Sequence, residues 1–136
     1  MERTILLLDG HDGVRAALAS RLRHAEGVGA VAAAKFLADA LTAVQASPPD
    51  AVVYDPHTVE GDATSTIARL AASGCPVIVL TSSLVGDEAA ALCDAGAAAL
   101  LLKGGTVTQL LREIDHAIIA SARPGPQTRH AALSGD

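Results

Sequence analysis

The chain has 136 residues, enough for one domain with a full hydrophobic core that needs no disulfide or metal cross-link. Half of the residues are apolar, which excludes intrinsic disorder for most of the chain, and the near absence of aromatic residues excludes a platform for stacking nucleic-acid bases. The formal charge of −5 argues against binding to phosphate backbones, so we expect no direct nucleic-acid contact by this chain.

The apolar runs and the cysteines indicate the cellular location of the protein. The first apolar run covers only residues 5–8 before Asp9, so the sequence predicts neither a signal peptide nor a membrane span. Cys75 and Cys93 lie in apolar surroundings without C-x-x-C spacing, which is typical of buried free thiols. We therefore expect a cytoplasmic protein that does not bind membranes.

Five short apolar runs, each followed by an amphipathic segment, succeed one another along the chain. The runs span residues 5–8, 28–33, 51–54, 77–80 and 98–102, and the amphipathic segments span residues 14–25, 36–46, 65–72, 87–95 and 107–122. Continuous rather than alternating hydrophobicity predicts strands that are covered on both faces, as in a parallel sheet. Five β-α units predict a doubly wound α/β fold with helices on both faces of the sheet.

The last amphipathic segment has the clearest helix signals. Thr106 and Gln109 have the spacing of a capping box. The apolar stripe that follows consists of Leu110, Leu111, Ile114 and Ile118. Residues 123–136 are rich in Pro, Gly and Ser and have no apolar period, which predicts a flexible tail or linker after a single domain of residues 1–122.

The residues that follow the apolar runs indicate a site. Ligands of doubly wound folds bind outside the carboxyl ends of the strands. Asp9, Asp55, Thr81 and Lys103 each follow directly after a predicted strand. Two carboxylates favour a hard cation such as Mg²⁺, which stabilises the charge of a phosphoryl group during transfer. Because an ammonium and a hydroxyl can hold phosphoryl oxygens, the pattern predicts phosphoryl chemistry at this edge of the sheet.

These residues, in this order, resemble the receiver domain of two-component response regulators over roughly residues 3–121. The motifs that carry the resemblance are I-L-L-L-D ending at Asp9, P-D-A-V-V-Y-D ending at Asp55, P-V-I-V-L-T ending at Thr81 and G-A-A-A-L-L-L-K ending at Lys103. The first motif resembles most the receivers that carry a helix-turn-helix output domain. The resemblance implies a flavodoxin-like, five-stranded parallel sheet with the strand order 2-1-3-4-5.

The resemblance also implies a role for each matching residue. Asp55 matches the phospho-acceptor. Phosphate binding and switching fall to Thr81, Ser82 and Lys103, and metal binding falls to Asp9, Asp55 and the backbone carbonyl of His57.

Three departures from the family pattern affect the metal site and the readout. Gly10 replaces a second acidic residue that normally ligates the metal, so we expect weakened Mg²⁺ binding, with Asp12 as the candidate replacement ligand. Leu100 stands where the family usually has a switching Tyr or Phe, and Thr58-Val59 replaces the usual Met-Pro. We hypothesise an atypical receiver that is phosphorylated poorly or not at all and works by dimerisation or by binding another ligand.

The resemblance implies partners as well. They are a histidine kinase and a second copy bound through the fourth and fifth helices and the fifth strand. For control of transcription, we expect either a DNA-binding effector domain that follows Arg123 in a longer product or action through a separate partner. We expect no enzymatic activity. Gly10 and Gly13 fit neither a dinucleotide-binding nor a Walker pattern, and a nucleophile elbow is absent from the sequence.

One alternative is a cobalamin-binding or other small-ligand-binding domain of the same fold. Asp9-Gly10-His11-Asp12 resembles the start of the D-x-H-x-x-G motif, with His11 as the cobalt ligand. Val14 stands where this motif requires glycine, and the motifs expected after the third and fourth strands are missing. The receiver interpretation therefore fits the sequence better.

Overall fold

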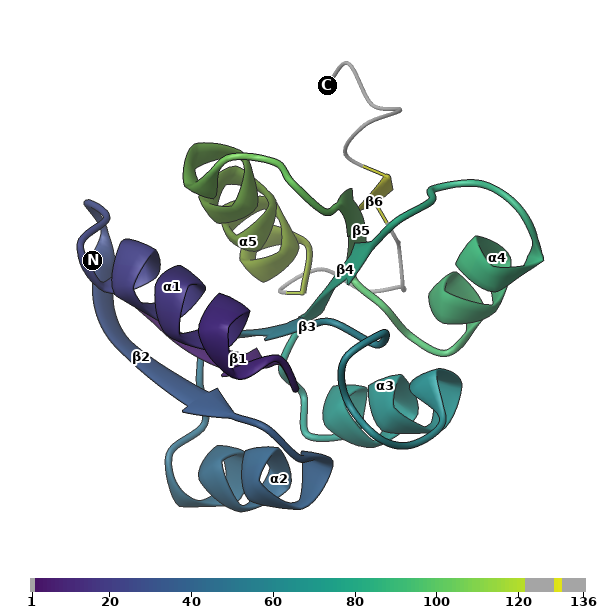
Figure 1. Ribbon diagram of the computed structural model, residues 1–136, viewed down its shortest axis with the longest axis horizontal. Helices are drawn as coiled ribbons and strands as arrows, with labels where there is room; N and C mark the ends of the chain where they lie inside the picture. Colours follow the sequence, from purple (N-terminus) through teal and green to yellow (C-terminus); the bar gives the residue numbers. More distant parts are fainter. Residues whose placement is uncertain (1, 122–128, 131–136) are drawn as a thin grey trace.

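Six strands form one parallel sheet in the structure, a computed structural model that describes residues 2–121 and 129–130 (Figure 1). The strands are β1 (Arg3–Leu8), β2 (Val28–Ala34), β3 (Ala51–Tyr54), β4 (Val77–Thr81), β5 (Ala99–Leu102) and β6 (Arg129–His130). All neighbouring pairs are parallel, in the order β2-β1-β3-β4-β5-β6. The predicted order 2-1-3-4-5 is confirmed, and β6 extends the sheet beyond β5.

Helices cover both faces of this sheet (Figure 1). They are α1 (Asp12–Arg23), α2 (Leu37–Ala46), α3 (Ala63–Ala71), α4 (Asp87–Asp94) and α5 (Val107–Ser121). Alternate residues of β1 point to opposite faces, as the pleat of a strand requires. Ile5 and Leu7 belong to the core under α1 and α5, whereas Leu6 and Leu8 belong to the core under α2, α3 and α4. The doubly wound fold is therefore confirmed.

Strand β2 departs from the expectation that every strand is covered on both faces. Among its seven residues only Val28, Val31 and Ala34 are buried. The reason is its position at the edge of the sheet. Alanine occurs on both buried and exposed surfaces, so an alanine-rich run is apolar by composition even where it is exposed. The continuous apolar run of residues 28–33 therefore had the pattern of a central strand.

Helix α5 begins with the predicted capping box. The backbone N–H of Thr106 donates to Gln109 Oε1 at 2.9 Å, and the backbone N–H of Gln109 donates to Thr106 Oγ1 at 3.1 Å. The four residues of the predicted apolar stripe all pack into or against the core on the α1 and α5 face. The exposed large apolar residue of α5 is Ile119, which lies outside that stripe and is 53% exposed.

The predicted tail, residues 123–136, lies outside the described residues except for residues 129–130. These two residues form β6, where the sequence predicted no regular structure. The register pairs Ala99 with Arg129 and Leu100 with His130. The predicted domain boundary at residue 122 also lies outside the described part of the chain.

Neither cysteine forms a disulfide bond with another described residue, and Cys75 is buried whereas Cys93 is only partly buried. None of the described helices combines the length and the apolar character needed to cross a membrane.

Candidate functional site

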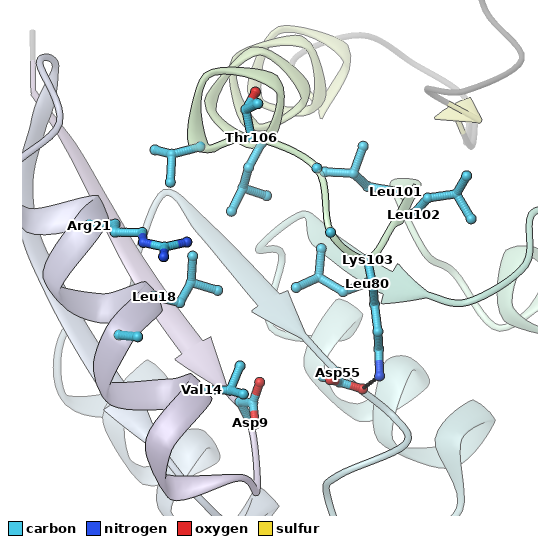
Figure 2. A pocket seen from close by; sticks show the side chains of 15 residues that line it. Asp9, Val14, Leu18, Arg21, Asp55, Leu80, Leu101, Leu102, Lys103 and Thr106 are labelled. Carbon is cyan, nitrogen blue, oxygen red and sulfur yellow. Dashed lines mark ion pairs between the residues drawn. The ribbon is translucent and has the colours of Figure 1, made fainter.

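Three charged side chains meet at the carboxyl end of the sheet. Asp9 follows β1, Asp55 follows β3 and Lys103 follows β5. Asp9 is fully buried, Asp55 is 5% exposed, and both line the same cavity as Lys103. The Lys103 Nζ atom lies 2.9 Å from Asp55 Oδ1, as the dashed line in Figure 2 marks. The structure thus brings together three of the four side chains that the sequence places at the strand ends.

One hydrogen-bond donor and one ion-pair partner lie at the same carboxylate oxygen of Asp55. The backbone N–H of His57 donates to Oδ1 at 3.0 Å, and the Lys103 ammonium forms an ion pair with the same atom at 2.9 Å. The other oxygen, Oδ2, has no hydrogen-bond partner among the described residues. A carboxylate anchored in this way presents its second oxygen as a nucleophile.

Asp9 is likewise held through one oxygen. Its Oδ1 accepts from the backbone N–H of His11 at 2.8 Å and from the Thr58 hydroxyl at 3.1 Å. Its Oδ2 is buried and has no hydrogen-bond partner in the described part of the protein. The Arg15 guanidinium donates to the Asp9 backbone carbonyl rather than to the carboxylate. The negative charge of Asp9 is therefore only partly compensated.

Thr58 closes the space beside Gly10. Its Oγ1 accepts from the Gly10 backbone N–H at 2.9 Å. A Cβ on residue 10 would lie 1.7 Å from the Thr58 carbonyl oxygen and 2.6 Å from its carbon. Only glycine fits in this position, because any other residue would overlap the backbone of the β3–α3 loop. The sequence marked Thr58 as a departure from the family pattern, but it gave no sign that residues 10 and 58 touch.

Asp12 and His57 make contacts away from the two buried carboxylates. The exposed Asp12 lies 2.8 Å from Arg15 and 3.5 Å from Lys35, and the hydrogen bond from Arg15, followed by the charge of Lys35, holds the Asp12 pKa below its usual value. The His57 imidazole lies 3.4 Å from Glu88 of α4. Among the described residues, no three His, Cys, Asp or Glu side chains are grouped so that they could hold a metal ion.

A cavity of about 330 Å³ opens beside the two carboxylates (Figure 2). Helices α1 and α5 and the ends of β4 and β5 form its walls, which are mostly apolar. The charged residues in its lining are Asp9, Arg21, Asp55 and Lys103.

The model of the response regulator receiver domain matches residues 5–115 of this chain. The chain belongs to the response regulator receiver family. No curated protein matches it.

Solved structures of other proteins share the fold of this receiver domain. A LuxR-family response regulator from Aurantimonas sp. SI85-9A1 is 20% identical, with a TM-score of 0.77 over 88% of this chain and 87% of that chain. The receiver domain of a modulated diguanylate cyclase from Desulfovibrio desulfuricans G20 is 24% identical, with a TM-score of 0.74 over 90% and 98%. A CheY-like receiver protein from Methanospirillum hungatei JF-1 is 19% identical, with a TM-score of 0.74 over 92% and 100%.

The cobalamin alternative finds no support in this receiver domain. His11 is the N-cap of α1, and its Nδ1 accepts from the backbone N–H of Val14 at 3.1 Å. This contact explains a histidine at the position by helix capping, because the side-chain acceptor satisfies one of the free N–H groups of the first turn.

Two of the three residues predicted for phosphate binding and switching, Thr81 and Ser82, lie outside the lining of the cavity in this receiver domain. The Thr81 hydroxyl is buried and donates to the Ser83 carbonyl at 3.1 Å, and Ser82 is exposed. Neither Thr81 nor Ser82 lines the cavity beside Asp55. Leu100 is fully buried in the core, in the same cluster as Leu92 of α4.

The donor set of this receiver domain does not fit a tightly bound Mg²⁺ ion. Mg²⁺ requires near-octahedral oxygen coordination. Asp9 and Asp55 each keep one carboxylate oxygen without a hydrogen-bond partner, but Gly10 supplies no third ligand and no third His, Cys, Asp or Glu side chain is grouped with them among the described residues. The predicted use of the His57 carbonyl as a ligand stays a prediction.

Proposed function

We propose that this chain is an atypical receiver in which Asp55 accepts a phosphoryl group slowly at most, so that signalling does not depend on rapid phosphorylation. The observation that carries the proposal is the overlap between the Thr58 carbonyl and the place of a Cβ on Gly10. The second acidic ligand is absent because residue 10 is glycine, and the loop after β3 leaves no room for a side chain at this position.

The residues that remain can still support a slow transfer. Attack by Asp55 Oδ2 on phosphorus would form an acyl phosphate as the bond between phosphorus and the donor's leaving group breaks. Lys103 would offset part of the charge on the phosphoryl oxygens. The buried Asp9 carboxylate opposes the approach of an anion, and no divalent cation is held firmly to offset it. The balance predicts a low rate.

The readout of phosphorylation is also altered. The Thr81 hydroxyl is already hydrogen-bonded to the backbone of Ser83. Leu100 is buried in the core, so this position has no aromatic ring that could move between a buried and an exposed position. We therefore propose that the output does not use a relay between a hydroxyl and an aromatic ring. The protein would act as a binding module and not as an enzyme.

A homodimer through α4, β5 and α5 belongs to the same proposal. Leu102 of β5 and Ile119 of α5 are apolar and exposed on these elements. Strand β6 pairs with β5, so the contact would use side chains of the helices rather than pairing with the β5 edge. We also propose that the chain interacts with a histidine kinase and with a DNA-binding effector domain that controls transcription. Its proposed location is the cytoplasm.

Incubation with phosphoramidate and Mg²⁺, followed by intact-mass measurement, tests the proposed function. We expect substoichiometric labelling that rises slowly and is lost in Asp55→Asn. Asp50→Asn is a matched control, because Asp50 bonds Thr4 at the opposite ends of the strands and should not affect labelling. Rapid, stoichiometric labelling that disappears in Asp55→Asn would overturn the proposal.

A further inference from the structure

The cavity between α1 and α5 is a second feature of the site, distinct from the acceptor oxygen of Asp55. Its volume of about 330 Å³ lies within the range of sites for small molecules, about 300–1,000 Å³. The walls contain Leu18 of α1, Leu80 of β4 and Leu110 of α5. Alanine at position 17 of α1 and the glycines of the β5–α5 loop leave this space open. An apolar body of a small molecule fits such walls.

Asp9 supplies a group that such a molecule can satisfy. The residue lies at the floor of the cavity and is fully buried, and its Oδ2 lacks a hydrogen-bond partner among the described residues (Figure 2). No described cation is paired with it, because Lys103 pairs with Asp55 and Arg15 pairs with Asp12. A buried carboxylate in this state is destabilised until a donor or a positive charge reaches it.

Arg21 faces the same cavity from α1, away from Asp9 (Figure 2). Its guanidinium has no ion pair or side-chain hydrogen bond with any residue of the described part of the chain. A guanidinium is well suited to bind a carboxylate or phosphate group. The cavity therefore has the Asp9 carboxylate at its floor, the Arg21 guanidinium on the α1 side and apolar walls between these two groups.

We propose that this cavity binds a small amphipathic amine, with its ammonium group on Asp9, its apolar body against Leu18, Leu80 and Leu110, and an anionic group at its far end on Arg21. An ammonium needs only hydrogen-bond acceptors and no octahedral set of ligands. The loss of the acidic residue at position 10 therefore does not prevent its binding. The inference goes beyond the proposed function and does not depend on phosphorylation of Asp55.

The test is a titration of the ¹⁵N-labelled chain with 8-aminooctanoate, followed by ¹H–¹⁵N NMR without Mg²⁺ or phosphodonor. We expect saturable shifts at the amides of Asp9, Leu18 and Gly104. Octanoate lacks the ammonium and octylamine lacks the anion. Each should bind about 10- to 150-fold more weakly, because a hydrogen bond to a charged group contributes about 1.5–3 kcal/mol.

Two variants and one control make the result specific. Ala17→Phe fills the cavity from an exposed position of α1 and should abolish the shifts, and Asp9→Asn should weaken binding about tenfold by removing the charge. Asp39→Asn removes an exposed acid of α2, outside the cavity lining, and should change nothing.

Dispersed spectra of each variant show that it is folded. Absence of saturable shifts in the unsubstituted chain would overturn the inference. Equal binding by octanoate, or unchanged binding by a folded Ala17→Phe variant, would also overturn it.

Discussion

The backbone carbonyl of Thr58 occupies the space that a side chain on residue 10 would need, since a Cβ there would lie 1.7 Å from the carbonyl oxygen. The Thr58 hydroxyl also accepts from the Gly10 N–H and donates to Asp9. The loop after β3 and the turn after β1 are thus packed as one unit. This packing leaves no room for a side chain on residue 10 and holds the Asp9 carboxylate at the same time.

Restoring the second acidic residue should therefore fail. Gly10→Asp must displace the β3–α3 loop, so we expect destabilisation of about 1–3 kcal/mol, the usual cost of overpacking, and no gain in Mg²⁺ affinity. Urea denaturation measures the stability, and a Mg²⁺ titration measures the affinity.

Gly13→Ala is the matched control for this change. A Cβ on Gly13 meets only His11 side-chain atoms at 3.4 Å and 3.7 Å, and alanine favours the helix by about 0.5–1 kcal/mol. A Gly10→Asp protein as stable as the unsubstituted chain would show that the loop moves freely and would contradict the packing argument.

Removing the charge of Lys103 should destabilise the fold more than removing the charge of Asp55. Lys103→Ala leaves a buried carboxylate unpaired. We expect a loss of about 1–2 kcal/mol, less than in a fully buried pair because the Lys103 side chain is 35% exposed. Asp55→Asn should cost less, since the freed ammonium can reach water.

The double variant Lys103→Ala/Asp55→Asn should recover most of the loss measured in Lys103→Ala by urea denaturation. Lys35→Ala removes the other lysine, which forms an exposed pair with Asp12, and should change the free energy of unfolding by less than about 0.5 kcal/mol. Additive losses in the double variant would show that the two residues do not interact.

Asp62 should make the stability of α3 depend on pH. Its carboxylate is the N-cap of α3 and accepts from the Ser65 N–H and the Thr64 hydroxyl, both at 2.8 Å. These two hydrogen bonds hold the Asp62 pKa below its usual value of 3.8, and the bond from Ser65 has the larger effect. The stabilisation that the ionised Asp62 carboxylate contributes is therefore complete above pH 3.8 and is lost as the pH falls through the lower pKa of the folded state.

Asp62→Asn keeps a good cap without a charge, so its urea midpoint should fall less than that of the unsubstituted chain on acidification. Asp39→Asn, in the first turn of α2, serves as a control acid that caps no helix. Parallel acid profiles of the unsubstituted and Asp62→Asn chains would contradict the assignment.

Tyr54 should destabilise the fold at alkaline pH. Its hydroxyl is fully buried and has no hydrogen-bond partner among the described residues. Burial raises the Tyr54 pKa above 10.0, and the Thr66 hydroxyl opposes this only in part. Because the folded state binds the proton more tightly, stability is retained below pH 10.0 and falls as the pH rises beyond it.

Tyr54→Phe removes this ionisation, so its urea midpoint should fall less between pH 9 and pH 11, a range of about one unit on each side of the usual tyrosine pKa. At neutral pH we expect equal or greater stability, because the unpaired hydroxyl is removed at nearly constant volume. A loss of more than about 1.5 kcal/mol in Tyr54→Phe at pH 7 would show that the hydroxyl makes a bond that stabilises the fold.

The order of the elements was predictable from sequence because apolar periodicity and capping residues act locally. The runs of residues 51–54 and 77–80 coincide with β3 and nearly with β4, and the capping box of Thr106 and Gln109 has the geometry that its spacing predicts. The exposure of strand β2, which the sequence did predict as a strand, and the two-residue strand β6 could not be predicted. Whether an apolar run is covered, and whether two residues pair with an edge, depends on neighbours distant in the chain.

The sequence by itself determined the strand ends that carry Asp9, Asp55 and Lys103, because parallel strands of this fold all end at the same edge. Only the tertiary structure decided that the Thr58 backbone fills the place of a second acid and that Asp9 keeps one oxygen without a partner. It also decided that a cavity separates α1 from α5. These features depend on the packing of loops and helices from distant parts of the chain, which no local pattern of residues encodes.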